Sequence, residues 1–386
     1  MPEPIEVGIV AGEASGDALG AHLIRALVER HPEMRFVGVG GPKMIGAGLD
    51  SWFPQEKLAV RGIVEVVRHL REITTIHREV VRRMRRNPPA LFIGVDAPDT
   101  NLRIARKLRR SGINTAQYVS PTLWAWRPGR IKTIKAAISH MLVLFPFEEK
   151  VYREAGVPVT FVGHPLADEI PDEIDRELAR EQLRIRGNHN VIAILPGSRQ
   201  SEIELIAPTF LRAAKLIHAA RPEVQFLAPF ISRETLNMFE QALYDTDTRE
   251  LPIQRMFGHS HEAMAAADVV LVASGTATLE AALLRRPMII AYKLNPLTWR
   301  IARPMVKLKQ VGLPNILAGE VIAPEFLQDD ATPENIAQAT LNLLDDKTVR
   351  SAVVSRCADL HLSLRRNAAQ CAADALLPLL RAHAGT

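Results

Sequence analysis

Short apolar segments alternate with longer amphipathic segments along the first part of the chain, and this alternation constrains the fold most. The apolar segments comprise residues 7–11, 35–39, 91–95, 115–119 and 141–145. Stretches with a helical 3.6-residue spacing of apolar residues lie between most of them. Apolar strands separated by helices are typical of a parallel sheet that is covered on both faces.

The same alternation begins again after a polar stretch, residues 167–190, that contains no strand signal. Its apolar segments are 191–195, 224–228, 269–272 and 287–291. A chain of 386 residues, 47% of them hydrophobic, is long enough to build two separate cores. We therefore predict an α/β fold with two doubly wound, Rossmann-like domains that face each other across a cleft, the arrangement called GT-B.

The domain boundaries follow from these patterns. Residues 1–166 form the first domain, 167–350 form the second, and 351–386 form a helical tail. We expect this tail either to cross back to the first domain or to be exchanged with a partner chain. Ligands of such sheets bind at the carboxyl ends of strands, so candidate residues are sought there.

Composition bounds the partners and the compartment. The net charge of +5 suits an acidic partner such as a nucleotide phosphate, a lipid phosphate or a bilayer surface, but it is too small to indicate nucleic-acid binding. Two cysteines, Cys357 and Cys371, without metal-ligand spacing predict reduced thiols in a cytoplasmic protein. The acidic start of the chain shows no signal peptide, and no apolar run reaches the ~20 residues of a membrane span.

Two strand-to-helix turns in the second half predict binding of a nucleoside diphosphate. In the first, Gly197 allows a sharp turn, amides near Ser198 lie at a helix N-terminus, and Arg199 adds a donor fork suited to pyrophosphate. The second places Ser274, Gly275 and Thr276 at the start of a helix. The alternative is an ordinary turn with a serine N-cap in each case.

Glu280 follows about one turn into the second of these helices. Its carboxylate is suited to accept hydrogen bonds from the two ribose hydroxyls, although a carboxylate near a helix start is also favourable on its own. Neither turn has the spacing of a Walker loop or of a GxGxxG fingerprint, so the usual sequence support for an ATPase or a dehydrogenase is missing.

Two carboxylates in the first half follow strands. Asp96 lies at the end of the segment 91–95, where a carboxylate that faces a substrate can act as general base on a hydroxyl. Glu13 lies in a glycine-bounded turn after the first strand and is a candidate for the same site. The alternative for Asp96 and Asp99 is a cap of the following helix, which we favour for Asp99 but not for Asp96. In the turn of Glu13, Ser15 and Asp17 are as easily helix caps.

No metal site or cofactor is predicted. The twelve histidines show no HExxH motif or other clustered ligand set. Asp245 and Asp247 have the DxD spacing of metal-dependent sugar transferases, but they lie in a polar loop rather than after a strand. Residues 63–84 predict a basic amphipathic helix, which either lies on an anionic membrane or packs its apolar stripe on the sheet.

Taken together, six motifs resemble those of the lipid-A-disaccharide synthases, and they occur in the expected order over nearly the whole chain. They are Ala11-Gly-Glu-Ala-Ser-Gly-Asp17, Gly94-Val-Asp-Ala-Pro-Asp99, Tyr118-Val-Ser-Pro-Thr-Leu-Trp-Ala-Trp126, Leu195-Pro-Gly-Ser-Arg199, Ser274-Gly-Thr-Ala-Thr-Leu-Glu280 and Leu313-Pro-Asn-Ile-Leu317. One departure is Thr100, where some members of that family have an aromatic residue.

The resemblance implies an inverting GT-B glycosyltransferase that acts without a cofactor. It would transfer 2,3-diacylglucosamine from UDP to 2,3-diacylglucosamine 1-phosphate, forming a β-1,6 linkage and releasing UDP. By motif, Asp96 is the essential carboxylate, Glu13 supports it, and Arg199, Glu280 and Asn315 hold UDP. The resemblance further implies a cytoplasmic protein at the surface of the inner membrane and homodimers that exchange C-terminal segments.

Two rival readings stay open on the sequence. A UDP-N-acetylglucosamine 2-epimerase can share this two-domain design and its nucleotide site. A basic nucleic-acid-binding protein would explain the charge, but the chain contains no recognised nucleic-acid module. Acyl-chain selectivity cannot be predicted, because it depends on the shape of a pocket.

Overall fold

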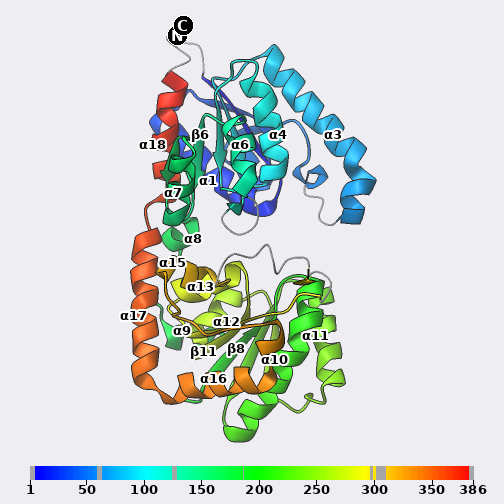
Figure 1. Cartoon of the computed structure of the whole chain (residues 1–386), viewed down its shortest axis with the longest axis vertical. Coiled ribbons are helices and arrows are strands. Elements are labelled where there is room, and N and C mark those ends of the chain that lie inside the picture. The colour runs from blue at the N-terminus through cyan, green and yellow to red at the C-terminus, as the bar shows by residue number, and fades with distance from the viewer. Residues whose placement is uncertain are drawn as a thin grey trace. The chain divides into compact units, whose positions relative to one another are not determined.

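The computed structural model describes residues 5–58, 63–123, 128–185, 187–295, 299–300 and 310–381. The chain divides into two compact units (Figure 1). The first contains Met1–Asp168 together with Leu364–Thr386, and the second contains Glu169–Ser363. No helix in the described ranges is long and apolar enough to cross a bilayer.

The first unit is built on a seven-stranded parallel sheet with the order β3-β2-β1-β4-β5-β6-β7. From β1 the chain proceeds outward to β3 and then returns to place β4 on the other side of β1, so the strand order reverses between β1 and β4. Its strands are β1 Glu6–Ala11, β2 Arg35–Val39, β3 Leu49–Ser51, β4 Leu91–Val95, β5 Thr115–Tyr118, β6 His140–Val143 and β7 Val159–Phe161.

Helices cover this sheet, and the buried residues of β1 and β4 show why. Both strands are apolar and almost completely buried, so each of their faces needs a covering layer. The helices are α1 Ala14–Arg30, α2 Pro42–Gly46, α3 Ile63–Arg86, α4 Pro98–Arg109, α6 Ile131–Lys135, α7 Pro146–Glu154, α8 Pro165–Glu169 at the boundary and α18 Ala368–Arg381, with 3-10 turns at Gln55–Lys57 and Pro128–Arg130.

The second unit repeats the design with a six-stranded parallel sheet of order β10-β9-β8-β11-β12-β13. Here the order reverses between β8 and β11, which pair directly through Val272 and Leu195. The strands are β8 Val191–Leu195, β9 Gln225–Phe230, β10 Ile253–Phe257, β11 Val269–Ala273, β12 Met288–Tyr292 and β13 Glu325–Leu327.

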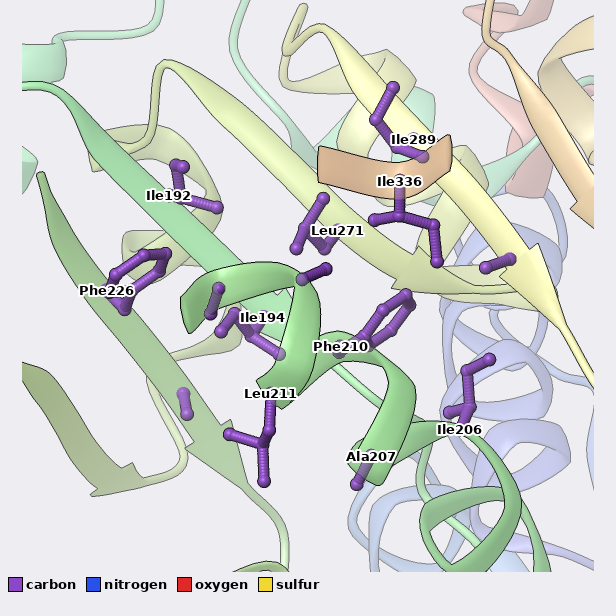
Figure 2. Close-up of a cluster of buried hydrophobic side chains, with 14 of the residues drawn as sticks. Ile192, Ile194, Ile206, Ala207, Phe210, Leu211, Phe226, Leu271, Ile289 and Ile336 are labelled. Atoms are coloured by element: carbon purple, nitrogen blue, oxygen red, sulfur yellow. The ribbon is translucent and has the colours of Figure 1, made fainter. Parts of the chain in front are cut away.

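The core of the second unit lies between this sheet and helices α10 and α16. Figure 2 shows Phe210, Leu271 and Ile336 meeting in this layer, and all three are fully buried. At about 25 cal/mol per Å² of apolar area, such burial is the main term that stabilises each unit. The helices are α9 Arg176–Gln182, α10 Gln200–Ala220, α11 Arg233–Asp245, α12 Ser260–Ala266, α13 Thr276–Leu283, α15 Leu313–Ala318, α16 Pro333–Asp345 and α17 Lys347–Leu364, with a 3-10 turn at Gln328–Asp330.

The C-terminal part of the chain differs from the predicted division at one point. The second unit continues to Ser363, beyond the predicted boundary at 350. α17 belongs to it because Cys357 is buried there and Arg356 pairs with Glu320 at 3.1 Å.

The last helix, α18, packs beside α1 of the first unit, although the two are more than 330 residues apart in the chain (Figure 1). Asp168 holds the start of α18 in place. Its carboxylate accepts hydrogen bonds from the backbone amides of Arg366, Asn367 and Ala368 at 3.1, 2.9 and 2.6 Å. A carboxylate at these amides satisfies donors that the helix itself leaves unpaired.

Replacing Asp168 by Ala should lower the free energy of unfolding by about 1–2 kcal/mol, because three amides lose their acceptor. Asp374→Ala is the matched control, since this α18 carboxylate pairs with Arg30 but is 63% exposed. We expect the control to lose less than about 0.5 kcal/mol. Urea unfolding followed by circular dichroism measures both, and equal losses would remove the capping role from Asp168.

Candidate active site

Asp96 is held in an unusual backbone conformation at the end of β4. Its φ is +52° and that of Ala97 is +38°, a region that residues other than glycine rarely adopt. The side chain is half-buried, and Ser15 Oγ donates a hydrogen bond to Asp96 Oδ2 at 2.7 Å. The carboxylate is therefore fixed at the carboxyl end of the sheet and is still reachable from solvent.

Two buried amide side chains hold the backbone of this turn. Asn101 Nδ2 and Gln117 Nε2 both donate to the carbonyl oxygen of Asp96, at 2.8 and 3.0 Å. Gly94 leaves the space that they need, because a Cβ there would lie 2.5 Å from Gln117 Oε1 and 2.6 Å from Asn101 Cβ. Neither amide is among the residues predicted from the sequence; the available signal was a glutamine inside the strand 115–118.

Glu13 occupies the N-cap position of α1, directly after β1, and its side chain is half-buried. Its carbonyl oxygen accepts hydrogen bonds from Gln55 Nε2 at 2.6 Å and from the Asp17 amide at 2.9 Å. Because β1 and β4 are neighbours, Glu13, Ser15 and Asp96 lie at one edge of the same sheet.

Asp17 belongs to the same motif but has a structural role. It is buried, and its carboxylate accepts from the amides of Gly41, Lys43 and Met44 at 2.9, 3.0 and 2.9 Å. It therefore caps α2 rather than its own helix. Asp99, expected as a helix cap, lies in the first turn of α4 and pairs with Arg130.

In the second unit, the turn after β8 already binds an anion, which is the side chain of Glu202. Glu202 Oε2 accepts hydrogen bonds from the amides of Ser198 and Arg199 at 3.1 and 3.2 Å. Arg199 pairs with the other carboxylate oxygen at 2.8 Å while its side chain stays 72% exposed. The acceptor for these two amides therefore comes from α10 itself.

The turn after β11 is more open. Gly275 and Thr276 are exposed, and Ser274 Oγ lies 3.4 Å from the carbonyl oxygen of Val311. Within the described ranges, no group accepts a hydrogen bond from the amides of Thr276 and Ala277. Since β8 and β11 pair directly, this turn and the turn at Ser198 leave the sheet side by side.

Glu280 lies on α13, one turn beyond that opening, and its side chain is 20% exposed. Its Oε2 lies 3.2 Å from Nε2 of His261 on α12. This contact, opposed by burial, raises the pKa of the His261 imidazole above its usual value. His261 was not among the predicted residues, because nothing in the sequence relates α12 to α13.

Asn315 lies inside the protein rather than at its surface. It is completely buried, its Nδ2 donates to the Ala323 carbonyl and to Glu325 Oε1 at 2.7 Å each, and its Oδ1 accepts from the amides of Ile322 and Ala323 at 2.8 and 2.9 Å. All the hydrogen bonds that the Asn315 side chain can make are thus formed within the protein, and they fix the backbone around it. The structure therefore shows Asn315 holding neighbouring backbone, and it leaves no polar atom of this side chain open for the direct contact with UDP that the resemblance implies.

The segment that Asn315 positions lies against the second turn. Glu325, its partner, also accepts from the amides of Val311 and Gly312 at 2.8 and 3.0 Å. The carbonyl of Val311 is in turn the acceptor for Ser274. Of the six motifs, the segment Trp124-Ala125-Trp126 lies outside the described residues.

The fold of the whole chain is found in solved structures. The chain superposes on a UDP-GlcNAc 2-epimerase from Neisseria meningitidis bound to UDP-GlcNAc with a TM-score of 0.63 and 13% identity, covering 97% of this chain and all of that one. MurG of Acinetobacter baumannii gives a TM-score of 0.55 at 15% identity, with 96% and 99% covered. These similarities confirm the GT-B fold and, at such identities, nothing beyond the fold.

The sequence comparisons separate the activities that share this fold. A lipid-A-disaccharide synthase from Methylobacillus flagellatus is 52% identical over 375 residues, which cover 97% of this chain and 99% of the relative. One from Chromobacterium violaceum is 49% identical over 379 residues, with 98% of each covered. The family model described as lipid-A-disaccharide synthetase matches residues 7–377. The chain therefore belongs to the lipid-A-disaccharide synthase family.

Proposed function

We propose that this lipid-A-disaccharide synthase transfers 2,3-diacylglucosamine from UDP to the 6-hydroxyl of 2,3-diacylglucosamine 1-phosphate. The observation that carries the activity is the near-complete match to synthases at about half identity. The epimerase alternative has only the fold in its favour, at 13% identity.

In the proposed reaction Asp96 is the general base. Its carboxylate removes the proton of the acceptor hydroxyl while that oxygen attacks the anomeric carbon, and the bond to UDP breaks with inversion. The half-buried position of Asp96 and its fixed hydrogen bond to Ser15 support this role, because a positioned base needs no reorganisation during the reaction. Glu13, at the same sheet edge, is proposed to orient the acceptor.

The second unit is proposed to hold the donor. The exposed turn at Gly275 and Thr276, whose open amides are those of Thr276 and Ala277, would bind the diphosphate together with the guanidinium of Arg199 and stabilise the charge of the departing UDP. Ser198 and Ser274 would contribute through the same two turns. Glu280 would accept hydrogen bonds from the ribose hydroxyls, and Asn315 would act through the segment 311–312 that it positions.

Location and assembly are further parts of the proposal. We place the protein in the cytoplasm, peripherally associated with the inner membrane where its acylated substrates reside. For a homodimer, the exchanged segment would be the part after Ser363. The packing of α18 on α1 supports this, since the same contacts would form with the first unit of a partner chain.

Asp96→Asn should lower kcat by about 10²–10⁴, the usual contribution of a general base, while UDP affinity stays within about twofold. The assay supplies both diacylglucosamine substrates and resolves the disaccharide by mass spectrometry. Asp99→Asn, a change of the same kind three residues away, is the control and should keep its turnover. Unchanged turnover in Asp96→Asn would reject the assigned role.

The same preparation also tests the rival activity. Incubated with UDP-N-acetylglucosamine alone, the unchanged protein should form no manno isomer detectable by NMR. Formation of that isomer, without disaccharide in the first assay, would favour the epimerase instead.

Glu280→Gln should weaken UDP binding by about tenfold, because hydrogen bonds to a charged acceptor contribute about 1.5–3 kcal/mol. It should also lower the pKa of His261 towards 6.5, since the Glu280 carboxylate is the main cause of its raised value. Calorimetry measures the affinity and NMR titration the pKa. A lowered pKa with unchanged UDP affinity would show that Glu280 only pairs with His261.

A further inference from the structure

A basic groove lies on the first unit between α3 and α4, away from the edge that carries Asp96. These helices are side by side (Figure 1), and the groove between them has a volume of about 350 Å³. At about 30 Å³ per water, this space exceeds what a phosphate group requires. Its walls come from one face of each helix: Thr74, His77, Arg78 and Val81 on α3, and Arg103, Ile104, Arg106, Lys107 and Arg110 on α4 and its C-cap.

The charge of this groove is entirely positive. Five of its lining residues are Arg or Lys and none is acidic. Within the part of the chain that the structure describes, none of the five has a carboxylate partner. The spacing brings like charges together, because Arg103 and Lys107, and Arg106 and Arg110, are neighbours at i,i+4 on a helix. A bound anion would relieve this repulsion.

His77 provides an independent indication of a ligand. Its side chain is only 7% exposed, yet it lines the groove, and its Nε2 has no hydrogen-bond partner. Buried polar atoms are nearly always paired, so an unpaired one calls for a partner that the chain does not provide. Burial, with Arg103 and Lys107 nearby, lowers the pKa of His77 to about 4, so the ring is neutral at pH 7.

We propose that this groove binds a phosphate oxyanion, held by the Arg and Lys side chains that line it and by an N–H of the lining residue His77. Arginine forks and lysine ammonium groups match the oxygens of a phosphate, and a neutral imidazole offers one further donor. The phosphate is either free in solution or part of a lipid headgroup, and the chemistry of recognition is the same. The site is independent of the proposed transferase reaction.

Its first test is an NMR titration of the ¹⁵N-labelled full chain with inorganic phosphate at constant ionic strength, with chloride as the background anion. His77→Gln assigns the reporter signal among the histidines. We expect a saturable shift of the His77 ring nitrogens and a rise of the His77 pKa, because a nearby anion stabilises the imidazolium. No donor or acceptor sugar is present, so the result does not depend on the transferase assay.

Matched double variants distinguish a site from general screening. Arg103→Gln/Lys107→Gln should weaken phosphate binding at least about tenfold, since two charge-assisted hydrogen bonds are lost. Arg82→Gln/Lys132→Gln removes the same charge from exposed positions outside the groove and should leave the affinity within about twofold. Equal weakening in the two variants would overturn the proposal.

A second arm identifies the source of the phosphate. Sedimentation with phosphatidylglycerol vesicles, against phosphatidylcholine vesicles, compares the two double variants. A loss of phosphatidylglycerol binding confined to Arg103→Gln/Lys107→Gln supports a lipid headgroup, whereas a response to inorganic phosphate alone supports the free anion. A chain in which neither probe distinguishes the two variants has no phosphate site in this groove.

Discussion

The pairing of one central strand with a parallel neighbour on each side, in each of the two sheets, determines where the candidate site residues lie. β1 lies between β2 and β4, and β8 lies between β9 and β11. In each sheet the connections that follow the two neighbouring strands, β1 and β4 or β8 and β11, run towards opposite sides of the sheet. The helices after these strands therefore diverge, and the carboxyl ends of the two strands stay uncovered. Glu13 and Asp96 follow β1 and β4, and Ser198 and Ser274 follow β8 and β11. The candidate residues are therefore a consequence of strand order.

At Asp96, two buried amide side chains fix the backbone conformation. A left-handed conformation at a residue other than glycine costs about 1–3 kcal/mol and persists only where its surroundings enforce it. Asn101 and Gln117 supply that enforcement through the carbonyl of Asp96 and through neighbouring carbonyls of β1, β4 and β5. The carboxylate is thus oriented by side chains that are completely buried. A substitution at either amide would act on chemistry through the backbone.

The two parallel sheets could be predicted from the sequence, because the periodicities of strands and of helices are local properties of the chain. It also located Asp96 and the two turns, since glycine and serine after an apolar strand have a local conformational meaning. It could not show that Glu202 reaches back to the amides of Ser198 and Arg199, because a capping carboxylate and an open anion site have the same residues. Nor could it show that Asn315 is buried, or that His261 meets Glu280. Those facts depend on how separate elements pack, which no local pattern records.

The carboxylate of Glu202 has a consequence for the order of events during turnover. The amides of Ser198 and Arg199 already have an acceptor in Glu202. Binding of a diphosphate at this turn would therefore replace one anion by another. The net free energy of binding is then smaller than the strength of the new hydrogen bonds, because the hydrogen bonds to Glu202 are lost. In the proposed reaction, Glu202 would remain close by when the nucleotide departs and would bind the two amides again. An internal carboxylate that competes in this way would weaken the binding of the product and so favour its release.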